Sequence, residues 1–274
     1  MRLFCVVLGL MVASSLAKND LAPRAYKPLP LGSISPQGWI LDQLILQANA
    51  LSGVLSKSTF PGAITVNNSL WVGGNGTAGG NTDQWLPYWT NGNVPLLELI
   101  RAAGPAATDR LDPALDLVHV MEEIIDYVIT NTNKTNGWIG PFINEPGDTN
   151  GHGLWDPLNM LRTLLNYAQA HPERERDIVK ACVAHLTEES SLLVKDPVYK
   201  WAQTRWPTYV EISQYVMDEF IDKYGDDGEV MPLGREGTAE MLFSSSTLFK
   251  TKGMDWQSYY HQTGIYKTPT LIFL

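Results

Sequence analysis

Apolar residues recur at helical spacing along most of the chain. Two clear stripes are Leu117, Met121, Ile124 and Val128, and then Leu158, Leu161, Leu165 and Ala168. Intervals of three and four residues place each stripe on one face of an α-helix. Convincing strand-like alternation of apolar and polar residues does not occur. The pattern therefore predicts an all-α protein.

Proline and capping residues stand at the predicted starts of several periodic segments. Ser35-Pro36, Asp112-Pro113 and Asp156-Pro157 each combine a capping side chain with proline, the arrangement typical of a helix start. Further helices are expected over residues 94–103, 173–194, 205–222 and 238–249. Residues 57–93 are rich in Gly, Asn and Thr and are interpreted as one long loop, a feature that usually has a function. Helical hairpins repeating in this way predict an α/α solenoid or a closed α/α toroid.

The first residues have the composition of a secretory signal peptide. Arg2 precedes an apolar run over residues 3–13, and Ser15-Leu16-Ala17 is a small-x-small cleavage site. The apolar run is too short to span a bilayer. We therefore predict a secreted protein with no membrane partner. Its expected divisions are a signal peptide (1–17), an extended arm (18–34), a partial toroid domain (35–256) and a divergent tail (257–274).

Net charge, the cysteine and the glycosylation motifs indicate which partners and covalent modifications to expect. The formal net charge of −9 argues against a nucleic-acid partner. Cys182 lies within a helical pattern and is predicted to be a buried, unreactive residue. Three N-x-Ser/Thr sequons predict glycosylation at Asn67, Asn75 and Asn133.

Common cofactor and metal motifs are missing from the sequence. The five histidines lack H-x-x-x-H or H-E-x-x-H spacing, so no metal site is predicted. Neither a G-x-S-x-G elbow, nor a Walker loop, nor a dinucleotide fingerprint occurs. We expect no cofactor.

Carboxylates beside aromatic residues form the remaining candidate chemistry. Cleavage of a glycosidic bond needs a proton donor, a second carboxylate or nucleophile, and surfaces on which sugar rings stack. The predicted stacking residues are Trp89, Trp138, Trp155 and Trp206. Asp83 or Glu145 would be the acid or a polar contact, and His152, Asp156 and Arg205 would bind the substrate. Structural alternatives remain open, since a loop Trp often covers a core, Asp83 suits a turn, and Asp156 suits a helix N-cap.

Several segments resemble a known family. Residues 28–39 read PLPLGSISPQGW, and later segments read PYW (87–89), NGWIGP (136–141), WDP (155–157) and RW (205–206). In this order they are similar to an uncharacterised branch related to glycoside hydrolase family 127, the β-L-arabinofuranosidase-like proteins. The resemblance extends from about residue 28 to residue 256. It implies an α/α toroid catalytic domain that acts on a glycoside.

The chain also departs from that family. The zinc-held cysteine nucleophile and the glutamate acid/base of its best-characterised members are expected beyond residue 274, and Cys182 does not match the motif. We therefore transfer neither zinc nor nucleophile. The expectation is a truncated chain with exposed apolar helix faces, which favour poor solubility or a partner.

Three functions remain possible. The leading one is a secreted glycoside hydrolase acting on arabinofuranoside-type or related plant or microbial glycans, with an inactive fragment as a variant of this hypothesis. The second is a non-catalytic carbohydrate-binding protein. The third is a polysaccharide lyase or uronide hydrolase, for which Arg205 is the single cation predicted among the aromatic residues.

Overall fold

The computed structural model describes residues 26, 28–57, 69–74, 82–141, 152–195, 198, 200–256 and 258. All regular secondary structure in these residues is helical, which confirms the all-α prediction. The α-helices are α1 (Gly38–Gln47), α2 (Gly53–Leu55), α3 (Thr82–Ala102), α4 (Pro105–Thr108), α5 (Leu117–Thr130), α6 (His152–Ala170), α7 (Pro172–Lys195), α8 (Lys200–Glu219), α9 (Ile221–Tyr224) and α10 (Gly234–Lys252). A π-helical turn, η1 (Ala48–Ser52), joins α1 to α2, and η3 (Leu70–Val72) is a short 3-10 helix.

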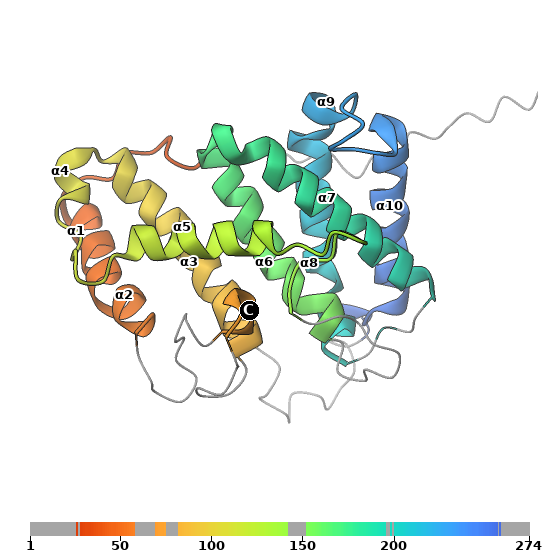
Figure 1. The fold of residues 1–274 in the computed structure, drawn as a ribbon, viewed down its shortest axis with the longest axis horizontal. Helices are drawn as coiled ribbons and strands as arrows, with labels where there is room; N and C mark the ends of the chain where they lie inside the picture. The colour runs from red at the N-terminus through yellow and green to blue at the C-terminus, as the bar shows by residue number, and fades with distance from the viewer. Residues whose placement is uncertain are drawn as a thin grey trace, which may run out of the picture.

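The long helices form two layers. Helices α3, α6 and α8 begin at the same end of the molecule and run in the same direction, with α6 packed between the other two (Figure 1). Helix α7 packs against α6 and α10, and α5 contacts both α3 and α7. Helices α1 and α10 lie at opposite ends of the long axis (Figure 1). The described helices therefore form an open row, and the closed toroid of the prediction is not confirmed.

The predicted apolar stripes form the interior. The stripe residues of α5 and α6 named above are all buried, and Leu158 and Leu161 are fully enclosed. Cys182 is also fully buried in α7, and burial raises the pKa of its thiol. The predicted burial of Cys182 is confirmed, and a protonated, buried thiol is a poor nucleophile.

Several helix starts were predicted wrongly. Residues 82–93 belong to α3 rather than to a loop, and α6 begins at His152 rather than at Asp156. Helix α5 begins at Leu117 after a turn, and α1 begins at Gly38 without a side-chain cap. In the last three cases proline was taken to mark the first turn of the helix, whereas α6 continues through its proline and α1 and α5 begin after theirs.

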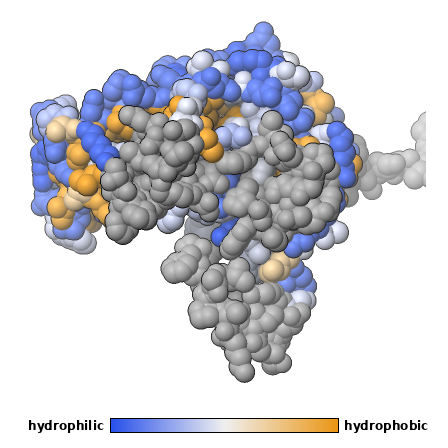
Figure 2. Space-filling model, turned by 60° about the horizontal axis from the view of Figure 1, so that its bottom comes forward, coloured by the Kyte–Doolittle hydropathy of each residue, from blue (hydrophilic) through white to orange (hydrophobic). Residues whose placement is uncertain are grey.

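The first helices leave part of their apolar surface uncovered. Ile40 and Leu51 are exposed, whereas Ile45 and Ala48 are buried. The π turn η1 adds a residue and so rotates the helical face that follows it relative to that of α1. Apolar side chains are thus exposed at the α1–α2 end of the molecule, where Figure 2 shows a group of apolar residues on the surface.

The N-terminal arm crosses the row of helices. The Leu31 N–H donates a hydrogen bond to Gln169 Oε1 (3.3 Å), and the Leu31 side chain packs on the core. The arm is thereby attached to the C-terminal end of α6. Within the part of the chain that the structure describes, no helix has the length and apolar character needed to cross a membrane.

Candidate functional site

Three parallel helices each carry a proline near their common end. Pro87, Pro157 and Pro207 lie inside α3, α6 and α8. Proline has no N–H, so the helix carbonyl four residues earlier loses its usual partner. In α8 this carbonyl belongs to Gln203, which accepts a hydrogen bond from the Met254 N–H (2.8 Å). At this end of the molecule, backbone carbonyls that lack a helical partner can therefore accept hydrogen bonds from other segments.

An aromatic and charged cluster lies at this end. The rings of Tyr88 and Trp155 are 6.0 Å apart between centroids, and Arg205 Cζ lies 5.0 Å from the centroid of the Trp155 ring. These residues come from α3, α6 and α8 in turn. Trp85, one turn before Tyr88, shares its face of α3. We call Trp85, Tyr88, Trp155, Asp156 and Arg205 the Tyr88 cluster.

The side chains of the Tyr88 cluster differ in their exposure to solvent. Tyr88 and Trp85 are 43% and 48% exposed, whereas Trp155 is 3% exposed. The guanidinium of Arg205 lies over the Trp155 ring, an arrangement that is more favourable when it is shielded from water. The half-exposed ring of Tyr88 thus lies against the buried Trp155 and its partner Arg205, which the other two helices supply.

The pKa of the Tyr88 hydroxyl depends on its burial and on the charges around it. Burial is the main cause that raises the pKa of Tyr88, and Asp156 raises it further. Arg205 and Arg162 lower the pKa, as does a hydrogen bond with Asn159. The net pKa is raised, so the phenol stays protonated at neutral pH and can donate a hydrogen bond. Carboxylate, amide and guanidinium groups therefore surround one hydroxyl.

Three residues of the predicted site come together here. Trp155, Asp156 and Arg205 all belong to the Tyr88 cluster. Asp156 lies inside α6, whose first residue is His152, so it does not act as the N-cap of that helix. It is also buried, unlike a typical capping residue at a surface helix end. The capping alternative for Asp156 is therefore wrong.

Two predicted stacking residues have structural contacts instead. Trp89 is buried, and its indole N–H donates to the Ser52 carbonyl (3.0 Å). The indole N–H of Trp206 donates to the Met254 carbonyl (3.0 Å). A Cβ on Gly253 would come within 2.3 Å of the Trp206 ring, which shows how closely the backbone packs there. Each indole joins its helix to another segment, so we correct their assignment as sugar-stacking residues.

Trp138 is likewise part of the interior. It is 2% exposed, and its ring lies 4.4 Å from that of His185 on α7. The next residue, Ile139, donates its N–H to His185 Nδ1 (2.9 Å). Residues 136–141 are thus fixed to α7 by a tilted ring contact and by a hydrogen bond from the backbone to the His185 side chain, and Trp138 offers no open face to a ligand in this structure.

Gly137 makes this close packing possible, and its replacement by alanine should destabilise the fold. Its φ of +77° is unfavourable for other residues, and a Cβ would meet the Ala184 Cβ at 2.5 Å. We expect Gly137→Ala to cost about 1–2 kcal/mol from the backbone alone, and more from the clash. Urea unfolding measures the change. Gly92→Ala is the matched control, since a Cβ there has open space and alanine favours a helix; equal stabilities for the two variants would contradict the packing described.

The side chains of the predicted acids, Asp83 and Glu145, lie outside the part of the chain that the structure describes. The whole of Glu145 lies outside it, as do the sequons at Asn67 and Asn75. Asp83 and His152 belong to α3 and α6, but their side chains also lie outside the description. Asn133 is exposed in the turn after α5, a position open to a glycan.

Sequence reasoning missed Asn159 and Arg162. Both act on Tyr88 from α6. The available signal was their spacing, because residues 155, 159 and 162 share one face of a helix. The missing information was the position of Trp155 inside a helix.

A buried ionisable pair on α7 was also missed by the sequence reasoning. His185 and Glu189 are both fully buried, with Nε2 and Oε2 3.3 Å apart. Burial lowers the pKa of His185 to about 3 and raises the pKa of Glu189 well above its usual value. Both side chains are therefore neutral in the folded protein at neutral pH. A His and a Glu four residues apart in a predicted helix were a visible signal of this pair.

Comparisons with known proteins add no family. No family model, no curated protein and no solved structure matches the chain. Within the described part of the structure, no group of three His, Cys, Asp or Glu side chains is arranged to hold a metal ion. The functional assignment therefore rests on the Tyr88 cluster and on the sequence.

Proposed function

We propose that this chain is a secreted protein of glycoside hydrolase type that binds its saccharide at the Tyr88 cluster. The observation that carries the proposal is the half-exposed ring of Tyr88, which lies against Trp155 and its Arg205 partner from two neighbouring helices, with half-exposed Trp85 on the same face of α3. Arabinofuranoside-type and related plant or microbial glycans are the proposed substrates, on the basis of the family resemblance.

The chemistry of the Tyr88 cluster suits a sugar. The C–H face of a sugar ring packs on an aromatic ring, and each hydroxyl can both donate and accept hydrogen bonds. The phenol of Tyr88 and the guanidinium of Arg205 are donors, and the carboxylate of Asp156 is an acceptor. Apolar faces and polar groups of both kinds are therefore adjacent.

Hydrolysis would require two acidic groups across the bond. Asp156 is the carboxylate that the described residues place in the Tyr88 cluster, and it is a candidate for one of them. Asp83 and Glu145 remain the proposed acids from the sequence. Asp83 lies on α3, five residues before Tyr88 in the same helix.

Carbohydrate binding without catalysis is the second candidate. It is favoured because the described side chains place one carboxylate in the Tyr88 cluster rather than a pair. Release of product from aryl L-arabinofuranosides would support the enzyme, and binding without release would support the second candidate. Turnover of uronate oligomers would instead indicate a lyase or uronide hydrolase.

Removing the Tyr88 ring should weaken saccharide binding. We expect Tyr88→Ala to lower the affinity about tenfold, because one stacking contact and one donor are lost. Titration calorimetry with a panel of neutral and acidic oligosaccharides measures the change. The control is Trp39→Ala, which removes a more exposed aromatic ring on α1. Binding that survives Tyr88→Ala but not Trp39→Ala would place the site elsewhere.

A further inference from the structure

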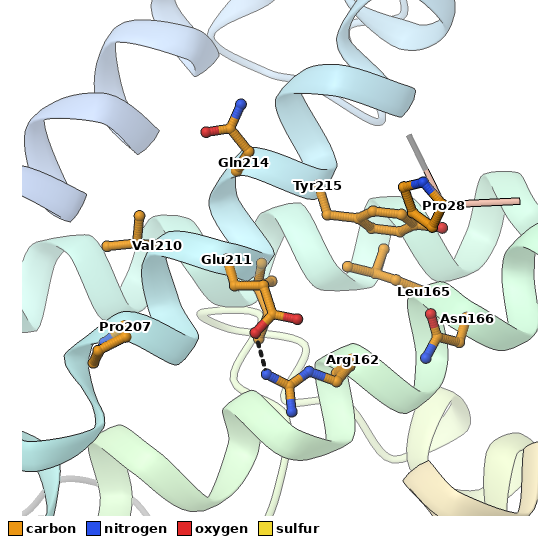
Figure 3. A pocket seen from close by; sticks show the side chains of 10 residues that line it. Pro28, Arg162, Leu165, Asn166, Pro207, Val210, Glu211, Gln214 and Tyr215 are labelled. Atoms are coloured by element: carbon orange, nitrogen blue, oxygen red, sulfur yellow. Dashed lines mark hydrogen bonds and ion pairs between the residues drawn. The ribbon is translucent and has the colours of Figure 1, made fainter. Parts of the chain in front are cut away.

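A second concave surface lies between α6 and α8, beside the N-terminal arm (Figure 3). Its volume is about 450 Å³. The side chains used below, all part of its lining, are Arg162, Leu165, Asn166, Pro207, Val210 and Glu211. We call this surface the α6–α8 pocket.

The α6–α8 pocket lies beside the Tyr88 cluster. Arg162 connects the two, since it lines the pocket and its charge also lowers the pKa of Tyr88. On α6, residues 155, 159, 162 and 166 follow one another at helical spacing and share one face. On α8, Pro207 lines the pocket two residues after Arg205. One strip of side chains therefore runs along α6 from Trp155 to Asn166, buried in its first half and partly exposed from Arg162 onward.

The length of this strip exceeds one sugar ring. Eleven residues separate Trp155 from Asn166, which corresponds to roughly 16 Å along the helix axis. The Tyr88 cluster occupies one end of the strip and the α6–α8 pocket the other. A single monosaccharide would leave one of the two unoccupied.

The chemistry of the α6–α8 pocket indicates a neutral ligand. Arg162 and Glu211 form an ion pair across it, joined by the dashed line in Figure 3, so their charges offset one another. The amide of Asn166 can both donate and accept hydrogen bonds. Leu165 and Val210 add apolar surface. The donors and acceptors match sugar hydroxyls, and the apolar base matches sugar C–H groups. This lining has no net positive charge that would attract a polyuronate.

We propose that the site binds an extended neutral oligosaccharide, with one sugar at the Tyr88 cluster and the following sugars along α6 in the α6–α8 pocket. The proposal rests on the function proposed above and adds the size and charge of the ligand. It assigns Arg162 a central position, since this side chain can contact sugars on either side.

Chain length is the variable that tests the proposal. Affinities are measured by calorimetry for arabino-, xylo-, manno- and malto-oligosaccharides, for the matching monosaccharides, and for oligogalacturonates. We expect a tetrasaccharide of one neutral series to bind about tenfold more tightly than its monosaccharide, as one or two additional hydrogen bonds would give. Asn166→Ala and Val210→Trp should remove this difference while leaving monosaccharide affinity unchanged. The second variant fills the pocket with bulk instead of removing a polar group.

Matched controls separate pocket effects from general ones. Asn131→Ala, at the residue that follows α5, and Val194→Trp on α7 make the same changes at exposed positions elsewhere. Both should keep the dependence on chain length. Thermal unfolding of each variant shows whether it remains folded.

The outcomes distinguish this inference from the proposed function. Monosaccharide binding without any gain from chain length overturns the extended site and leaves the Tyr88 cluster standing. A gain that survives both pocket variants, or one confined to oligogalacturonates, also overturns it. Failure of every sugar to bind overturns the proposed function together with it.

Discussion

Glu189→Gln is expected to make the protein more stable than the wild type at pH 8, with little difference between them at pH 4. In the folded wild type, burial keeps Glu189 protonated and His185 neutral. In the unfolded chain, Glu189 loses its proton near pH 4.5 and His185 loses its proton near pH 6.5. The folded state is therefore penalised for holding a proton that the unfolded chain would release.

The dependence on pH follows from counting protons. Below about pH 4.5 the unfolded pair binds one proton more than the folded pair, so stability rises with pH. Between about pH 4.5 and pH 6.5 the counts are equal, and this pair adds no slope. Above about pH 6.5 the folded pair holds the extra proton on Glu189, and stability falls by about 1.4 kcal/mol per pH unit until the folded pKa of Glu189 is reached. Glutamine cannot ionise, so the variant loses this alkaline fall.

Urea unfolding of both proteins from pH 4 to pH 9 measures the effect. His171 also titrates, because its hydrogen bond with Glu98 raises its pKa, and the stability this provides is lost above about pH 6.5. Both proteins contain His171, so the difference between their curves isolates Glu189. Parallel curves above pH 6.5 would show that Glu189 is ionised in the folded protein and would contradict the neutral pair.

Trp155→Ala should cause the largest loss of stability among the residues of the Tyr88 cluster. The ring is almost fully buried between Tyr88 and Arg205, so truncation removes its packing and leaves a cavity. Losses for buried aromatic residues are about 3–5 kcal/mol. Denaturant unfolding at pH 6 gives the value, and Trp155→Phe should retain most of the stability. A variant as stable as the wild type would show that Trp155 does not support this end of the helices.

Trp85→Ala separates binding from stability. Trp85 is half exposed, so its truncation should cost little folding energy while still removing a surface for the sugar. Saccharide binding should therefore weaken in a variant that unfolds like the wild type. Comparison with Trp155→Ala then shows which losses of affinity come from contact and which from unfolding.

Much of the fold could be predicted from the spacing of apolar residues. The stripes of α5 and α6 are buried as expected, because a three- and four-residue period admits one helical face. Helix starts were less predictable. Proline is compatible with a first turn and with an interior kink, and the choice depends on tertiary contacts such as the hydrogen bond of Met254 to the Gln203 carbonyl.

The candidate site could be predicted in composition but less well in arrangement. The residue types of the Tyr88 cluster were recognised, and Trp155, Asp156 and Arg205 lie together. Four tryptophans had the same local character in the sequence, but their burial depends on which helix lies opposite. Trp138 faces His185, a contact between segments 47 positions apart that local pattern does not encode.

The central claim is that a saccharide contacts the half-exposed rings of the Tyr88 cluster, and the tryptophan side chains test it most directly. Indole N–H signals can be followed by NMR during titration with the tightest-binding oligosaccharide of the panel, after assignment by single substitutions. We predict that the signals of Trp85 and Trp155 shift, while those of Trp89, Trp138 and Trp206 remain in place. Shifts confined to the latter three, or no shift in any of the five at saturating sugar, would contradict the claim.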